Sequence, residues 1–329
     1  MEIYIVLVLL LLVMSFFKSN KVLFLVSTFF LIFLAGYREV NVGSDTINYF
    51  YIFKGRIEGS DLEFLFVWLL TFVEQVGGDF NFLLLILAIL CVLPVSYVVY
   101  KTSNNVFYSL FVYTSLFFYF NSFNITRQSI AVSFCFLGYY FLDKKKLKSF
   151  IIAIIIGFLF HRSAIIAFIL YPLLLVNVSK KLMYLITVLS LILSTTGVFT
   201  SLLTILGFFG EKYLAYSSLL DIKEGGIVTR LLLNVFLLTI IFLVKKIDIW
   251  LISMFIGVIV LNVLSFSPEL GRLSQIFLIG QVVLFANLRF YVEKSKYFFL
   301  TFVVSIYCLS VFTVLLLSNS GEIVPYKMF

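Results

Sequence analysis

Charged residues are scarce in this chain: they make up 12% of its 329 residues, whereas 63% are hydrophobic. A soluble domain carries about 25% charged residues. The shortage excludes an ordinary soluble fold and predicts an all-α polytopic membrane protein. The longest polar interruptions, 37–61 and 195–227, are too short to bury a core of their own, so we expect one integral membrane domain over residues 1–329.

Cysteine and histidine are almost absent as well. The three cysteines, Cys91, Cys135 and Cys308, lie inside apolar runs without metal-ligand spacing, so we interpret them as small buried side chains. Asp61 and Glu63 have a D-x-E spacing that could serve a metal, but a helix N-cap explains the pair better. We therefore expect no metal and no other cofactor.

Long apolar runs, bounded by charges or turn residues, make up most of the chain. A run of about 20 such residues spans a membrane as an α-helix. We identify twelve candidate spans, near 3–17, 22–36, 80–100, 105–120, 127–142, 149–161, 163–179, 182–197, 228–244, 249–265, 272–288 and 297–317. A thirteenth run, 62–76, is ambiguous, because a span there would reverse the orientation of every later loop.

Basic residues decide the orientation. If the run 62–76 does not span, alternate loops collect fourteen basic residues, thirteen of them lysines, with a cluster at 144–148. Cytoplasmic loops carry such an excess, so we place these loops inside and both termini outside. The net charge of +8 follows from this bias and does not indicate a nucleic-acid partner. The run 62–76 then becomes a re-entrant or interfacial helix within a first outer segment, 37–79.

Arginine and lysine are distributed differently between the two sides. Six of the seven arginines lie on the predicted outer side. Orientation requires only charge, which lysine supplies, whereas arginine presents a planar fork that binds phosphate oxygens in pairs. We therefore expect a phosphate or diphosphate ligand at the outer face.

Two polar outer segments supply the first candidates for contact with this ligand. Segment 36–49 (GYREVNVGSDTINY) contains Arg38, Asp45 and Tyr49. Segment 121–131 (NSFNITRQSIA) contains Asn124, Arg127 and Gln128. The last three have i, i+3, i+4 spacing, which predicts one face of a helix. In so apolar a chain, such segments lie at the membrane surface or line a wet cavity.

Later polar residues add to the set. His161, Arg162 and Ser163 interrupt two apolar runs, and His161 is the only histidine in the chain. Arg230 begins one late run, and Arg272 begins another. The large outer loop 195–227 mixes charges and tyrosines, which suit sugar contacts, so we predict that it covers the substrate.

Together these motifs resemble the EpsG-like branch of the Wzy-type polysaccharide polymerases. The likeness rests on an arginine followed by V-G-x-D-T and an aromatic residue, a later N-x-x-R-Q-x-x-A, an F-H-x-S-A run and a late G-R-L. Here these are Arg38 with 42–46 and Tyr49, Asn124 to Ala131, Phe160 to Ala164, and 271–273. The motifs are short, but their order extends over most of the chain.

The resemblance implies a GT-C-like membrane glycosyltransferase at the outer face of the bacterial cytoplasmic membrane. Such enzymes join oligosaccharide repeat units that are carried on undecaprenyl diphosphate. The expected partners are this lipid-linked oligosaccharide and membrane lipid, with a chain-length regulator as a further candidate.

The reaction implied by the resemblance suggests roles for the polar residues. Cations that stabilise a leaving diphosphate contribute a large part of catalysis, and the candidates are Arg38, Arg127, Arg162 and Arg272. Support for substrate binding is expected from Tyr49, Asn124, Gln128, Ser163 and Arg230. Asp45 and His161 compete for the role of general base, with a narrow preference for Asp45.

Two other functions also suit an apolar chain of this length. A lipid-linked oligosaccharide flippase would have charge near the middle of the membrane and internal repeats, and neither is apparent. A membrane acyltransferase would depend on His161 alone.

Overall fold

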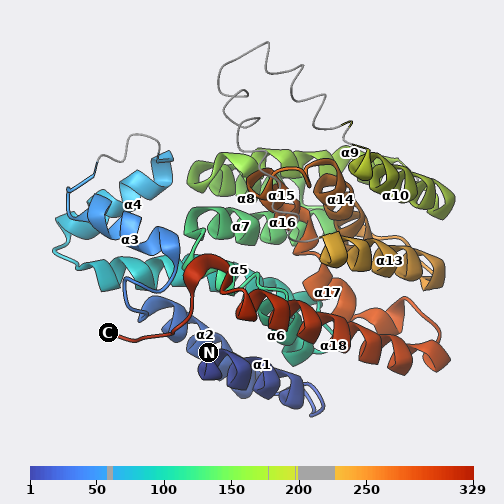
Figure 1. The fold of residues 1–329 in the computed structure, drawn as a ribbon, viewed down its shortest axis with the longest axis horizontal. Helices are drawn as coiled ribbons and strands as arrows, with labels where there is room; N and C mark the ends of the chain where they lie inside the picture. The colour runs from blue at the N-terminus through green and yellow to red at the C-terminus, as the bar shows by residue number, and fades with distance from the viewer. Residues whose placement is uncertain (58–61, 177, 197, 199–226) are drawn as a thin grey trace. The chain divides into compact units, whose positions relative to one another are not determined.

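The computed structural model describes residues 1–57, 62–176, 178–196, 198 and 227–329. Over these ranges the regular structure is helical, without a β-strand, which confirms the all-α class (Figure 1). The predicted covering loop 195–227 lies almost wholly outside the described residues. The chain divides into two compact units, Met1–Phe168 with Gln281–Phe329 and Ile169–Gly280, each considered by itself below.

The first unit contains most of the candidate residues. Its α-helices are α1 (Glu2–Met14), α2 (Lys21–Gly36), α3 (Ser44–Phe53), α4 (Phe64–Gln75), α5 (Phe80–Thr102), α6 (Val106–Ser115), α7 (Thr126–Asp143), α8 (Leu147–Phe160), α17 (Gln281–Ala286) and α18 (Lys294–Leu317). Short 3-10 turns add η1 (Phe120–Phe123), the start of η2 (Arg162–Ile169), η4 (Leu288–Phe290) and η5 (Ser320–Glu322). At its centre α7 packs against both α8 and α5, and α5 packs against α2.

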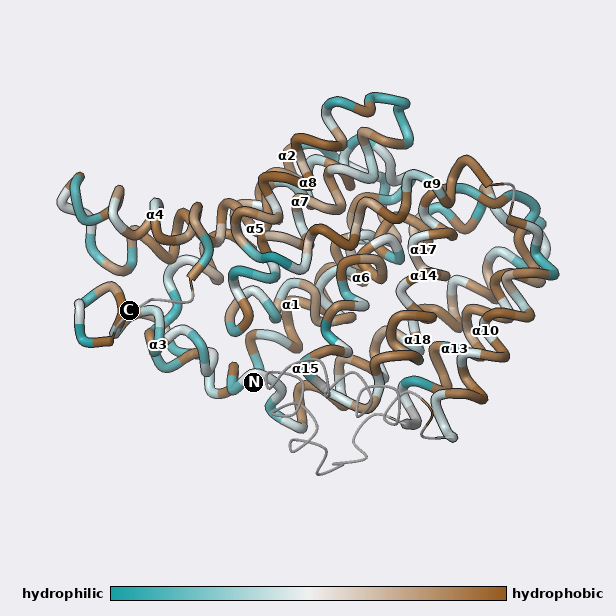
Figure 2. The backbone as a smooth tube through the Cα atoms, turned by 90° about the horizontal axis from the view of Figure 1, so that it is seen from above, coloured by the Kyte–Doolittle hydropathy of each residue, from teal (hydrophilic) through white to brown (hydrophobic). Residues whose placement is uncertain are grey.

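Among the residues that the structure describes, two helices, α5 and α18, are long and apolar enough to cross a membrane by length and composition. Eight further apolar segments are shorter, between 10 and 17 residues. Hydrophobic residues dominate these helices, whereas the stretch around α3 is more hydrophilic (Figure 2). The run 62–76 is helical as α4, and α3, ahead of it, was not predicted.

Three predicted spans are divided. The run 105–120 ends its helix at Ser115, just before Phe117 adopts a positive φ of 65°. The run 163–179 forms η2 and then α9 (Leu170–Leu175), which has Pro172 in its first turn, where a missing N–H removes no helical hydrogen bond. The run 272–288 forms several short helical pieces. The count of twelve spans and the GT-C-like arrangement stay predictions.

The second unit is built around one buried helix. Its elements are α9, α10 (Lys180–Thr195), α13 (Ile227–Leu243), α14 (Ile249–Val263), α15 (Pro268–Gly271), η3 (Arg272–Ser274) and α16 (Gln275–Leu278). Buried Asn262 of α14 exchanges two 2.8 Å hydrogen bonds with Asn234 and donates a third, of 2.9 Å, to Ser190. Each amide is thereby hydrogen-bonded in an apolar interior, where an unpaired polar group is costly.

Candidate functional site

The start of α3 is held against the turn that precedes α7. Gly43 has a φ of 94°, and a Cβ at this position would lie 1.9 Å from the carbonyl oxygen of Phe123. Only glycine adopts this backbone conformation without strain and allows so close an approach. Thr46, one turn into α3, donates a 2.8 Å hydrogen bond to the same carbonyl.

Asn124 caps α3 from outside the helix. Its side-chain Oδ1 accepts hydrogen bonds from the Ser44 hydroxyl, at 2.7 Å, and from the Asp45 backbone N–H, at 3.1 Å. The first backbone N–H groups of a helix have no partner within it, so this contact stabilises α3. The prediction that Asn124 shares a helical face with Arg127 is wrong, because α7 begins only at Thr126.

Arg38 lies in the interior of the first unit. It is 1% exposed, and it donates hydrogen bonds to the backbone carbonyl of Ala35, to Thr46 Oγ1 at 3.3 Å and to the Phe123 carbonyl at 3.5 Å. Its guanidinium carbon lies 5.1 Å from the centre of the Phe123 ring. Burial lowers the pKa of Arg38 to about 10, which leaves it charged at neutral pH. These surroundings favour a structural role over the predicted contact with a diphosphate.

The C-terminal tail completes this junction, which sequence patterns did not indicate. The carbonyl of Glu322 accepts a 3.0 Å hydrogen bond from the N–H of Gly43, and that of Lys327 accepts one of 2.9 Å from Glu39. The Tyr326 hydroxyl donates to the Leu34 carbonyl at 3.0 Å. Residues 279 to 292 positions apart are therefore neighbours, and no local signal could have revealed them.

Arg127 has different surroundings. Its Nη1 forms an ion pair with Glu63, and its Nε donates a 3.3 Å hydrogen bond to the Tyr49 hydroxyl. The guanidinium carbon also lies 5.8 Å from the ring centres of Tyr49 and Phe66. The Arg127 side chain remains 24% exposed and that of Glu63 9%. The guanidinium is thus held at two nitrogens, in a side chain that remains partly exposed.

Glu63 makes contacts that the sequence did not indicate. It occupies the N-cap position of α4, in agreement with the N-cap interpretation, but its side chain makes no capping hydrogen bond there. Its second carboxylate oxygen instead accepts a 3.4 Å hydrogen bond from the backbone N–H of Arg162. Its neighbour in the D-x-E pair, Asp61, lies outside the described residues.

His161 ends α8 beside this carboxylate. Its Nδ1 lies 2.6 Å from the Ser163 hydroxyl, in a hydrogen bond whose direction depends on the imidazole tautomer, and 3.3 Å from the Ser163 backbone nitrogen. Burial is the main influence and lowers the pKa of His161; Glu63 raises it, while Arg127 and Arg162 lower it. A lowered pKa keeps the imidazole neutral at pH 7, the form that accepts a proton. We call Glu63, Arg127, His161 and the Arg162 backbone the Glu63 cluster.

The other predicted residues occupy varied positions. Asp45 is half-buried in the first turn of α3, one helical turn before Tyr49, while Gln128 is buried and Arg162 is exposed. Arg230 is half-buried in α13 and Arg272 is exposed in η3; both belong to the second unit. Among the described residues no three potential metal ligands come together, and metal independence stays a prediction.

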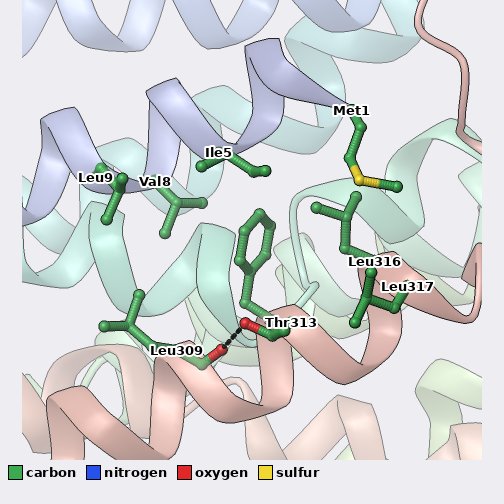
Figure 3. A pocket seen from close by; sticks show the side chains of 9 residues that line it. Met1, Ile5, Val8, Leu9, Leu309, Thr313, Leu316 and Leu317 are labelled. Carbon is green, nitrogen blue, oxygen red and sulfur yellow. Dashed lines mark hydrogen bonds between the residues drawn. The ribbon is translucent and has the colours of Figure 1, made fainter.

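An apolar hollow of about 160 Å³ lies between α1 and α18 in the first unit (Figure 3). Its nine lining residues include one with a polar side chain, Thr313, whose hydroxyl donates a 2.8 Å hydrogen bond to the Leu309 carbonyl. The hollow therefore offers hydrocarbon contacts and no charge. It has no group that could bind a diphosphate.

Comparison with known protein families identifies a match that extends over most of the chain. The sequence model of the EpsG family, a family of Wzy-type polymerase-like proteins, matches residues 21–328. No curated protein and no solved structure shows significant similarity to the chain. The match includes both units and every candidate residue described above, and this chain therefore belongs to the EpsG family.

Proposed function

We propose that this chain is a polysaccharide polymerase that joins undecaprenyl-diphosphate-linked oligosaccharide repeat units. Family membership over residues 21–328 is the observation that carries the proposal. The Glu63 cluster supports it, because the cluster combines a partly exposed arginine with an imidazole that is neutral at pH 7.

The proposed reaction breaks one glycosidic bond and forms another. The bond between the growing chain and its lipid diphosphate breaks, and a hydroxyl at the nonreducing end of the incoming unit bonds to the released sugar carbon. The hydroxyl proton passes to a general base, and undecaprenyl diphosphate leaves with the bonding electrons. Arg127 and Arg162 bind this leaving group, and no metal is required.

The identity of the base is the main change that the geometry suggests. The sequence favours Asp45, but Asp45 lies in the first turn of α3, where the helix dipole stabilises the carboxylate and so disfavours proton uptake. His161 is half-buried, and the 2.6 Å contact with the Ser163 hydroxyl fits the tautomer in which Nδ1–H donates to Ser163 Oγ and the unprotonated Nε2 takes the proton of the acceptor hydroxyl. We therefore prefer His161 as base, with Asp45 as an orienting residue. Tyr49, Asn124, Gln128 and Ser163 of the first unit support substrate binding.

Purified protein in detergent micelles tests the function. The substrate is lipid-linked repeat unit extracted from producing cells that lack this protein. We expect a ladder of polymer and one released undecaprenyl diphosphate for each new linkage. A parallel assay uses the same protein reconstituted in vesicles. There, movement of the unit across the membrane without a ladder would instead identify a flippase, and transfer of an acyl group would identify an acyltransferase.

The proposed location is the bacterial cytoplasmic membrane, with twelve spans in a GT-C-like arrangement and with both termini and the active site outside. Single cysteines at positions 56 and 146 test the orientation in intact cells with an impermeant reagent. Position 56 should be labelled, and position 146, in the lysine cluster, only after permeabilisation. The reverse pattern would contradict the proposed topology.

A further inference from the structure

Glu63 joins three separate parts of the first unit through one carboxylate. The residue itself stands before α4, one oxygen pairs with Arg127 at the start of α7, and the other accepts the Arg162 N–H after α8. The carboxylate is only 9% exposed. A buried carboxylate is costly unless cations and donors compensate it, so Glu63 depends on both of its partners, Arg127 and the Arg162 N–H.

We propose that Glu63 is a positioning residue, which orients Arg127 toward the substrate diphosphate and balances the positive charge around His161. The inference rests on the proposed polymerase function and deepens it. Glu63 itself contacts neither the diphosphate nor the acceptor sugar. It acts through Arg127 and His161.

The geometry of Arg127 carries the first half of the inference. Nη1 forms an ion pair with Glu63, and Nε donates a hydrogen bond to the Tyr49 hydroxyl. The rings of Tyr49 and Phe66 lie near the guanidinium carbon. Within the described part of the chain, Nη2 makes no hydrogen bond. Because the guanidinium is planar, fixing two nitrogens also fixes the direction of the third. Glu63 therefore determines where the remaining donors of Arg127 point.

The charges around His161 carry the second half. The charged groups that act on His161 are Glu63 before α4, Arg127 on α7 and Arg162 on η2. Of these only Glu63 is negative, and it alone raises the pKa of His161. Removing its charge leaves burial and two arginines, all of which favour neutral imidazole. The pKa of His161 should then fall further.

Glu63→Gln is the direct test, because glutamine keeps the size and one acceptor while it removes the charge. We expect kcat/KM for polymer formation to fall on the order of tenfold to a hundredfold, through misplacement of Arg127. The acid limb of the pH profile should move to lower pH, because a His161 with a lower pKa becomes protonated only at a lower pH. Glu74→Gln is the matched control: Glu74 is exposed on α4, and its variant should retain the wild-type rate and profile.

Two further variants make the test decisive. In a His161→Ala background the pH shift from Glu63→Gln should disappear. Glu63→Asp keeps the charge on a shorter side chain. It should lower kcat/KM but leave the acid limb of the pH profile near its wild-type position. This variant provides the test if Glu63→Gln does not fold. A Glu63→Gln enzyme with wild-type kcat/KM, or with a limb moved to higher pH, would overturn the inference.

The outcomes separate this inference from the proposed function. If the wild type forms no polymer from its own repeat unit, the proposed function fails. If the wild type forms polymer and the Glu63 variants are indistinguishable from it, only the role of Glu63 fails.

Discussion

Arg38 and Arg127 both belong to segments of the first unit that the sequence predicts to be outside, and both are candidates for diphosphate binding, yet their surroundings differ. Arg38 is 1% exposed and donates to two backbone carbonyls and a threonine hydroxyl. Arg127 is partly exposed and contacts a carboxylate and a tyrosine hydroxyl. An arginine that donates its hydrogen bonds to backbone carbonyls connects parts of the fold. An arginine that is positioned by a few side chains still has N–H groups that can bind a ligand.

The two arginines therefore predict two kinds of failure. Around Arg38, substitutions should lower stability, because they leave buried carbonyls without donors. Around Arg127, they should lower the rate of polymer formation at nearly constant stability. The predictions below test this separation, from the largest expected effect to the smallest.

Gly43→Ala should have the largest effect, on folding. The new Cβ would lie 1.9 Å from a backbone oxygen, at a φ of 94° that alanine disfavours, and we expect a loss of more than about 4 kcal/mol. Gly55→Ala is the control, because Gly55 has a φ of 65° with no atom near its Cβ position, and it should cost about 1–2 kcal/mol. Thermal unfolding in detergent measures both, and equal losses would show that the close approach to Phe123 does not matter.

His161→Ala should have the largest effect on chemistry. Loss of a general base lowers the rate by about 10²–10⁴. It should also remove the acid limb of the pH profile. We expect the wild-type limb below about pH 6.5, the unperturbed pKa of histidine, because burial lowers the pKa of His161. Asp45→Asn should lower kcat less and leave KM nearly unchanged. If Asp45→Asn is instead the more severe variant and His161→Ala retains the limb, Asp45 is the base.

Arg127→Lys and Arg38→Lys compare the two arginines directly. Lysine keeps the charge and loses the planar fork. At position 127 we expect about a hundredfold less polymer at an unchanged unfolding temperature. At position 38 we expect a loss of about 2 kcal/mol in stability, with a nearly wild-type rate for each folded molecule. The proposed difference between the two arginines is contradicted if both variants lose only stability, or if both lose only the rate of polymer formation.

Asn124→Ala should have the smallest effect. It removes the external cap of α3, and loss of a capping side chain costs about 1 kcal/mol. Asn124→Asp is the control, since aspartate keeps the oxygen that accepts from Ser44 and from the Asp45 N–H. Unfolding temperatures of the two variants should differ, with the aspartate variant closer to wild type. Equal values would mean that the cap does not stabilise α3.

The sequence by itself determined the class of this protein. Low charge and long apolar runs require helices, because each apolar segment must satisfy its own backbone hydrogen bonds. α5 and α18 follow the predicted runs, and the motifs around Arg38, Arg127 and His161 were sufficient to indicate the EpsG family. These are local or compositional properties, which a chain displays before it folds.

Only the tertiary structure decided which polar residues meet. Glu63 and Arg127 are 64 positions apart, and the same D-x-E pattern suits a helix cap as well as an ion pair. The tail that meets Gly43 is more distant still. Arginine binds a backbone carbonyl, a carboxylate or a phosphate with the same fork, so the residue type could not separate Arg38 from Arg127. The packing of α3, α4 and α7 separates them, because it determines which acceptors each guanidinium reaches.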